Sequence, residues 1–234
     1  MTRDELRLLT YNANMELPAR GLVVYTWGNV SQFDIATGAM AIKPSGVPYE
    51  SLSSQDIVVM DLDANILEGD KNPSSDTDTH LALYRVWRGQ IGGIVHVHST
   101  YATAFAQAQL PIPCYGTTHA DYFYGQIPVT VPLKPPAVEA AYEKATGDAI
   151  VELFKRENLN PLHVPGVLVH GHGPFAFGKD AAQAVHNAVV LEQIAYMAYL
   201  TRTLTPQPTP LPAHILDKHF LRKHGPNAYY GQKE

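Results

Sequence analysis

The chain has 234 residues, of which 45% are hydrophobic, and 17 lysines and arginines against 22 acidic residues give a net charge of −5. This length and apolar content suit one domain with a large core, and the acidic balance lacks the basic surface that nucleic-acid binding needs. The single cysteine, Cys114, excludes an internal disulfide and is typical of a reducing compartment. No apolar run reaches the ~18 residues of a membrane helix, and the charged first residues do not resemble a secretory signal. We therefore expect a cytoplasmic protein without nucleic-acid or membrane partners.

Helical and strand patterns alternate along the whole chain. In chain order we expect a helix at 2–17, strands at 23–25, 40–42, 57–61 and 66–67, a helix at 79–87, a strand at 91–95, helices at 102–109 and 138–157, a strand at 166–169 and a helix at 181–204. Asp180 is the expected N-cap of the last helix. The proline-rich residues 205–212 predict a stiff spacer, followed by a polar, aromatic tail at 213–234. With no linker elsewhere, the pattern predicts one α/β domain over 1–234, with a largely antiparallel sheet covered by helices.

Two histidine pairs, His96-Val97-His98 and His170-Gly171-His172, follow the glycine-bounded apolar strands at 91–95 and 166–169. Side chains at i and i+2 of a strand point to the same face, so His96 and His98 can present both imidazoles to one ion. A histidine of the second pair can supply a third imidazole. Three imidazoles with one open position commonly hold catalytic zinc. Ordinary structural histidines are the alternative, but two pairs that both end strands favour a metal site.

Several polar loops offer candidates for binding an anion. They are Gly28–Ser31, Lys43–Gly46 and Pro73–Asp76, which carry glycine, hydroxyl, amide and ammonium groups. Each loop taken singly is also an ordinary turn. Asp76 suits an N-cap, a fourth metal ligand or an acid/base equally well. Asp121 lies among aromatic residues, where it is either a turn residue or a general acid/base whose pKa desolvation would raise.

Long motifs in this chain resemble the class II sugar-phosphate aldolase/epimerase family nearly end to end. They are Thr26–Ser31, Ile42–Val47, Pro73–Thr77, Gly92–His96, Gly116–Gly125, His172–Ala176, Asp217–Gly225 and Ala228–Gln232. The resemblance implies a three-layer sandwich with a largely antiparallel central sheet. It also implies a bound Zn²⁺, for which other divalent metals could substitute.

The resemblance implies roles for individual residues. His96, His98 and His172 match the metal ligands, with Asp76 as the adjacent carboxylate, and His170 is then structural. The substrate and its phosphate would be held by Asn29, Lys43, Ser45, Gly46, Ser74, Ser75 and His219. Asp121 and Tyr230 match the acid/base positions. Tyr230 and His219 are expected to come from a neighbouring subunit, in a homotetramer with shared active sites.

The activity that the resemblance implies is epimerisation at C4 of a phosphorylated ketopentose. The alternatives are an aldolase that releases a free aldehyde and a non-catalytic binding module of the same fold. Related aldolases have a glutamate where this chain has Asp76, and the shorter side chain suits support of a metal better than proton transfer to carbon. Together with Asp121 and the adjacent Tyr229 and Tyr230, this favours the epimerase.

Overall fold

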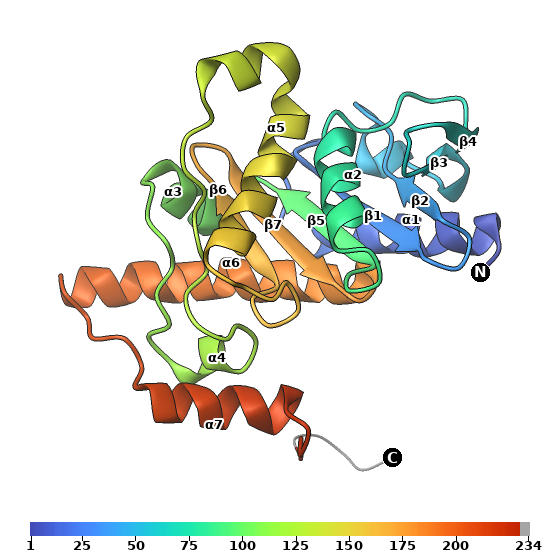
Figure 1. Cartoon of the computed structure of the whole chain (residues 1–234). Helices are drawn as coiled ribbons and strands as arrows, with labels where there is room; N and C mark the ends of the chain where they lie inside the picture. The colour runs from blue at the N-terminus through green and yellow to red at the C-terminus, as the bar shows by residue number, and fades with distance from the viewer. Residues whose placement is uncertain (230–234) are drawn as a thin grey trace.

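A seven-stranded sheet forms the middle of the molecule in the computed structural model, which describes residues 1–229 (Figure 1). The strands are β1 (Gly28–Asp34), β2 (Ala39–Ile42), β3 (Val58–Asp61), β4 (Ile66–Glu68), β5 (Gly93–Val97), β6 (Gly166–Val169) and β7 (Gly173–Gly178). They lie in the order β4-β3-β2-β1-β5-β7-β6, and each neighbouring pair is antiparallel. The predicted α/β class with a largely antiparallel sheet is confirmed.

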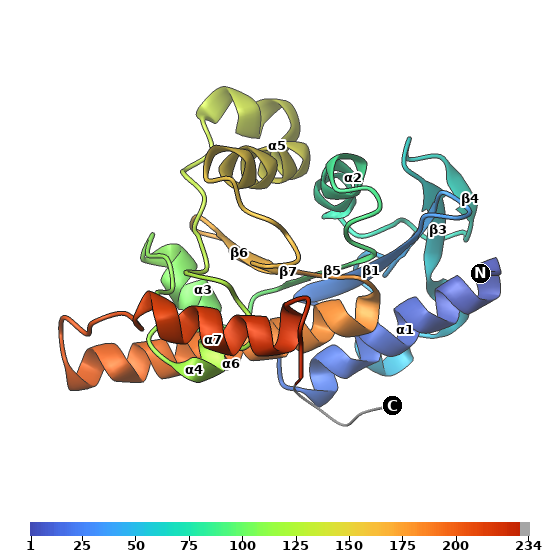
Figure 2. The same cartoon turned by 60° about the horizontal axis from the view of Figure 1, so that its bottom comes forward.

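Helices cover both faces of the sheet. They are α1 (Arg3–Ala19), α2 (Thr77–Val86), α3 (Thr100–Gln107), α4 (Thr117–Ala120), α5 (Pro135–Arg156), α6 (Ala181–Leu204) and α7 (Ala213–His224), with short 3₁₀ turns η1 (Tyr49–Ser51) and η2 (Ser54–Asp56). Seen along the sheet, α2 and α5 lie on one side, and α1 and α6 lie on the other (Figure 2). Asp180 caps α6 as expected, its side chain accepting from the Gln183 amide.

Side chains of β5 alternate between the two cores. Ile94 belongs to the buried cluster under α2 and α5, whereas Val95 and Val97 belong to the cluster against α1 and α6. His96 lies between these two valines and therefore points to the α2/α5 side. Strand pairing places Asn29 of β1 directly opposite His96. The end of β5 thus presents polar groups to one face only.

The expected strand at 23–25 is wrong, because the first strand begins at Gly28. The polar residues of β1 concealed it from a hydrophobicity pattern. In the folded chain these residues are buried and paired: Ser31 Oγ lies 2.7 Å from His80 Nδ1 and 2.9 Å from the Tyr84 hydroxyl. Burial of a polar group is tolerated when it is hydrogen-bonded, so β1 is a central strand despite its composition.

Helix α5 is interrupted near its N-terminal end. Ala141 has non-helical dihedral angles, φ −167° and ψ 86°, inside the helix. Figure 1 shows the resulting change of direction at the top of α5. Beyond the break, the hydroxyl of Thr79 on α2 donates to the Glu143 carbonyl at 2.6 Å. The predicted helix at 138–157 is therefore two helical pieces, and the junction is held against α2.

The segment after the proline-rich spacer folds into a helix, α7, where a tail with little to bury was expected. Phe220 is only 2% exposed, and its ring lies 4.9 Å from that of Tyr124. Helix α7 lies beside α4 of its own chain, away from α5 and α2 (Figure 1). Tyr230, expected to act in catalysis, lies outside the described residues.

Within residues 1–229, the helices are too short or too polar for any of them to span a membrane.

Candidate metal centre and its pocket

Three histidines converge at the ends of β5 and β6. Candidate ligand atoms of His96, His98 and His172 all lie within 4.8 Å of one another. The Nε2 atoms of His96 and His98 are 3.1 Å apart. Two imidazole nitrogens bound to one tetrahedral zinc at about 2.0–2.1 Å would be separated by about 3.3 Å. The spacing therefore fits a shared ion.

The ring nitrogens that face away from the cluster fit the same arrangement. His96 Nδ1 lies 3.0 Å from the Pro174 carbonyl oxygen, which can only accept, so Nδ1 carries the hydrogen and Nε2 keeps its lone pair. His172 Nδ1 lies 3.2 Å from the Tyr142 hydroxyl, which can accept in the same way. Metal-binding histidines usually have such partners on the opposite ring nitrogen. The donor set thus suits a divalent metal.

Burial favours the neutral form of two of these imidazoles, those of His98 and His172. Burial, reinforced by the neighbouring histidines, lowers the pKa of His172 to about 4. Burial and the proximity of His96 also lower the pKa of His98. Metal binding needs the neutral imidazole, so burial favours the form of His98 and His172 that can bind a metal.

Asp76 occupies the N-cap position of α2, but its carboxylate does not cap the helix. It accepts instead from Asn29 Nδ2 at 2.7 Å. Burial opposes ionisation of Asp76, but His96, His80 and the Asn29 bond outweigh it and hold its pKa below the ordinary value. Asp76 lines the same pocket as the histidines without belonging to their close cluster.

Two of the candidate anion-binding loops are joined to each other. An isolated antiparallel bridge pairs Pro44 with Pro73, and the Ser74 amide donates to the Lys43 carbonyl at 3.0 Å. The third loop, Gly28–Ser31, contacts the Pro73–Asp76 loop through Asn29, whose Nδ2 donates to Ser74 Oγ at 3.1 Å. The buried Asn29 Oδ1 has no hydrogen-bond partner within residues 1–229. It is an acceptor suited to a substrate hydroxyl.

Lys43 supplies the positive charge of this wall. The residue is only 2% exposed, and its Nζ donates to the Val47 carbonyl at 2.6 Å and lies 4.9 Å from the centre of the Tyr49 ring. Burial lowers the pKa of Lys43 to about 8. An anion in the pocket would favour the charged ammonium.

One pocket of about 400 Å³ brings together ten of the thirteen predicted site residues. Its lining includes Asn29, Lys43, Ser45, Gly46, Ser74, Ser75, Asp76, His96, His98 and His172. Tyr142 and Glu143, which sequence reasoning missed, line it as well. Their only sequence signal is their place near the start of a predicted helix, directly after Ala141, where the helix is interrupted.

Asp121 and His219 lie elsewhere, at the contact of α4 and α7. Asp121 accepts from Arg222 Nη2 at 2.8 and 2.9 Å, and its Oδ1 lies 3.0 Å from His219 Nδ1. Burial opposes ionisation, but the bonds from Arg222 and His219 and the charge of Lys223 lower the pKa of Asp121. The expected rise in this pKa is therefore wrong, because cations on α7 dominate over the aromatic surroundings. Neither residue lines the histidine pocket of its own chain.

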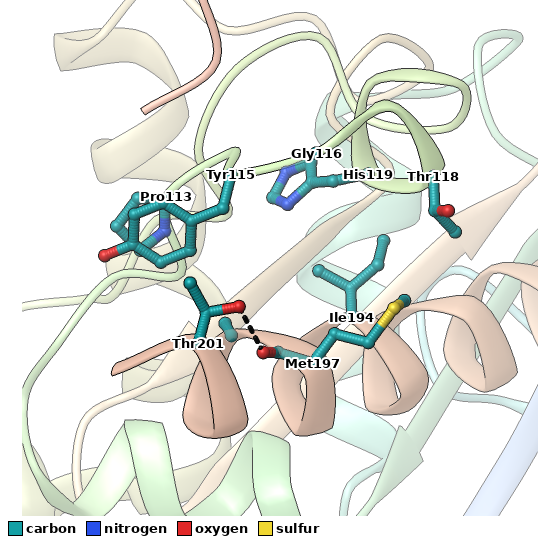
Figure 3. Close-up of a pocket in the computed structure, with 9 residues that line it drawn as sticks. Pro113, Tyr115, Gly116, Thr118, His119, Ile194, Met197 and Thr201 are labelled. Atoms are coloured by element: carbon teal, nitrogen blue, oxygen red, sulfur yellow. Dashed lines mark hydrogen bonds between the residues drawn. The ribbon is translucent and has the colours of Figure 1, made fainter. Parts of the chain in front are cut away.

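A second pocket, of about 180 Å³, lies between α4 and α6 (Figure 3). It is lined by Tyr115, His119, Ile194 and Met197 among others. The buried His119 Nε2 lies 2.7 Å from the Gly125 carbonyl oxygen, and burial lowers the pKa of His119 to about 4. No metal-ligand cluster faces this pocket within residues 1–229. The histidine pocket is therefore the better candidate for catalysis.

Comparisons with known proteins agree with this geometry. Residues 9–199 match the model of the family described as Class II Aldolase and Adducin N-terminal domain. The chain is similar to an L-fuculose 1-phosphate aldolase structure, with 27% identity and a TM-score of 0.78 over 94% of this chain and 96% of that one.

Two further structures share the fold. YgbL from Escherichia coli, titled a putative aldolase/epimerase/decarboxylase, has 22% identity and a TM-score of 0.70 over 92% of this chain and 97% of that one. L-fuculose-1-phosphate aldolase from Thermus thermophilus has 24% identity and a TM-score of 0.67 over 88% of this chain and 100% of that one. The family match spans most of the chain and includes the strands that carry the three histidines. The chain belongs to the class II aldolase and adducin N-terminal domain family.

Proposed function

We propose that this protein is an L-ribulose-5-phosphate 4-epimerase that interconverts L-ribulose 5-phosphate and D-xylulose 5-phosphate with a divalent metal, Zn²⁺ in the first instance. The observation that carries the proposal is that the three-histidine cluster and the joined polar loops line one pocket. A short ketose phosphate has oxygens on C2 and C3 that suit a metal and a phosphate that suits the loops.

The residues of the pocket are proposed to bind different parts of the substrate and the metal. Lys43, with the hydroxyls and backbone amides of Ser45, Gly46, Ser74 and Ser75, would hold the phosphate. The orphan acceptor Asn29 Oδ1 would take a substrate hydroxyl. His96, His98 and His172, with Asp76 beside them, would hold the metal, which as a Lewis acid polarises the C2 and C3 oxygens.

The chemistry at C4 needs more than deprotonation of carbon, because C4 is not adjacent to the C2 carbonyl. Removal of the C4 hydroxyl proton lets the C3–C4 bond break. Its electron pair passes to the C1–C3 fragment, the enediolate of dihydroxyacetone, and the other fragment is glycolaldehyde phosphate, whose carbonyl carbon is the former C4. The phosphate contacts keep this fragment in place while its aldehyde turns. Re-formation of the C3–C4 bond on the other aldehyde face, with protonation of the new C4 oxygen, completes the epimerisation.

Two acid/base groups on opposite faces are required, and Asp121 and Tyr230 are proposed for them. The lowered pKa of Asp121 supports an ionised carboxylate able to accept a proton at neutral pH. Asp121 and His219 contact each other but do not line the pocket of their own chain. This supports an active site completed by a neighbouring subunit. In our proposal that subunit supplies Asp121, at the end of α4, together with His219 and Tyr230 of the 213–234 segment. A closed ring, in our proposal a homotetramer, supplies one such contact per site.

An aldolase is the second candidate, favoured by the similarity to L-fuculose 1-phosphate aldolase. The two activities use the same bond cleavage and differ in whether the aldehyde is released. The adducin branch of the family makes a binding module the third reading, but three histidines whose ligand atoms lie within 4.8 Å of one another argue for a metal enzyme.

The test is an assay of zinc-loaded protein with L-ribulose 5-phosphate, in which D-xylulose 5-phosphate and free glycolaldehyde phosphate are measured separately. The epimerase forms D-xylulose 5-phosphate without accumulating aldehyde. Stoichiometric aldehyde release, from this substrate or from L-fuculose 1-phosphate, would establish the aldolase instead. Protein that binds a metal and converts no sugar phosphate would contradict both.

A further inference from the structure

We propose that Glu192, in the middle of α6, is a positioning residue that holds the metal ligand His98 by gripping the chain immediately after it. The inference deepens the proposed function and rests on its metal site. Glu192 interrupts the apolar stripe of α6 and is only partly exposed. Its carboxylate is directed at the start of α3.

Three hydrogen bonds converge on this carboxylate. Ser99 Oγ donates to Oε2 at 2.8 Å, the Tyr101 amide donates to Oε1 at 2.8 Å, and the Ala102 amide donates to Oε2 at 2.9 Å. Ser99 is the N-cap of α3, yet its side chain caps none of the helix amides. A carboxylate more than 90 residues away in sequence therefore does the work of the local cap.

The three hydrogen bonds to Glu192 lie directly after His98 in the chain. Of the three histidines, His98 has the fewest contacts that fix its side chain. His96 lies within β5 and has the Pro174 carbonyl on its Nδ1, and His172 has the Tyr142 hydroxyl. His98 lies beyond the last residue of β5, and its Nδ1 has no hydrogen-bond partner within residues 1–229. What restrains His98 is therefore its backbone, and Glu192 anchors the residues directly after it.

The charge of Glu192 suits this position. The first-turn amides of a helix carry a partial positive charge, so a carboxylate is favoured there and an amide is a poorer replacement. A glutamine keeps one acceptor oxygen, but its NH₂ group would face an N–H or O–H donor. Glu192→Gln should loosen the His98 backbone while changing the volume of the side chain little.

The experiment compares metal affinity by competition of Zn²⁺ with a chromophoric chelator, and the ligand field by absorption of Co²⁺-substituted protein. Glu192→Gln should raise the metal dissociation constant by about 10- to 100-fold, as loss of a supporting group around a metal ligand typically does. The Co²⁺ spectrum should change as well. Asp180→Ala is the control, because it removes the N-cap bond to the Gln183 amide of α6 without touching α3.

A purely structural role for Glu192 predicts that both variants lower the melting temperature and leave metal affinity equal to that of the wild type. A dissociation constant for Glu192→Gln within twofold of the wild type would therefore overturn the inference. If Glu192→Gln does not fold, Ser99→Ala carries the test: it removes one of the three bonds and should weaken metal binding to a smaller extent, and unchanged affinity would again overturn it. Wild-type protein that binds neither metal would refute the metal site in the proposed function, a result distinct from failure of the Glu192 variants alone.

Discussion

The hydroxyl of Tyr142 lies 3.2 Å from Nδ1 of His172, although the two residues come from different elements. Tyr142 directly follows Ala141, the residue at which α5 is interrupted. If His172 holds the proposed metal through Nε2, its Nδ1–H would donate to the phenol oxygen. The phenol hydrogen is then free to serve a substrate oxygen.

Tyr142→Phe should therefore weaken metal binding and activity together, each by about 10-fold or more. The change removes the acceptor on His172 Nδ1 and leaves the ring in place. Tyr124→Phe is the control for metal affinity, since it breaks the bond to Asp217 Oδ1, far along the chain from the histidines. Chelator competition on the two variants measures the effect, and equal affinities would show that Tyr142 does not support His172.

Arg222→Gln should move the acidic limb of the kcat/KM profile to higher pH by about one unit. The Arg222 guanidinium is a main cause of the lowered pKa of Asp121, and its removal makes the carboxylate easier to protonate. The base form is then lost at a higher pH. Arg156→Gln, which breaks the exposed pair with Glu157, should leave the profile unchanged. An Arg222→Gln profile that coincides with the wild type would argue against Asp121 as the base.

Mixed oligomers test the shared active site. Asp121→Asn and His96→Asn chains should each be inactive alone, since one lacks the proposed base and the other a proposed metal ligand. In a random equal mixture, about one quarter of the contacts in a ring join an intact metal site to an intact Asp121, so about one quarter of wild-type activity should return. Tyr230→Phe should complement His96→Asn in the same way. Confirmed hybrids without activity would mean that each chain supplies its own Asp121.

Metal-free protein should lose stability between pH 6.5 and about 4 because of His119. Burial lowers its folded-state pKa from 6.5 to about 4. In that window the unfolded chain binds a proton that the folded chain does not, so the free energy of unfolding falls as pH falls, for this residue by up to about 3 kcal/mol. Above pH 6.5 His119 is neutral in both the folded and the unfolded chain, so it does not lower the free energy of unfolding there.

His119→Gln isolates this effect. Between pH 7 and 5 the wild type should lose about 2 kcal/mol more than the variant, because glutamine does not titrate. Urea unfolding at several pH values measures the difference. His214→Gln, at an exposed position, is the control and should run parallel to the wild type. Parallel curves for His119→Gln would show that His119 is protonated as easily in the folded protein as in the unfolded chain.

The three-histidine cluster could be predicted from the sequence because its geometry is partly local. In a strand, i and i+2 share a face, so His96 and His98 point the same way wherever β5 lies in the molecule. Buried Val97 on the other side of the sheet follows from the same alternation. The apolar strands β5 and β6 and the capped α6 were also readable, since their hydrophobic patterns and the Asp180 cap are properties of contiguous residues.

Only the tertiary structure decided the features that depend on hydrogen bonds and charges between residues far apart in sequence. The polar composition of β1 hid a central strand, because Ser31 is paired with His80 and Tyr84 from another element. The cations of α7 reversed the expected pKa shift of Asp121, the packing of α5 placed Tyr142 beside His172, and Glu192 took over the cap of α3. Backbone periodicity is encoded in neighbouring residues, whereas these charges and hydrogen bonds exist only once distant segments pack together.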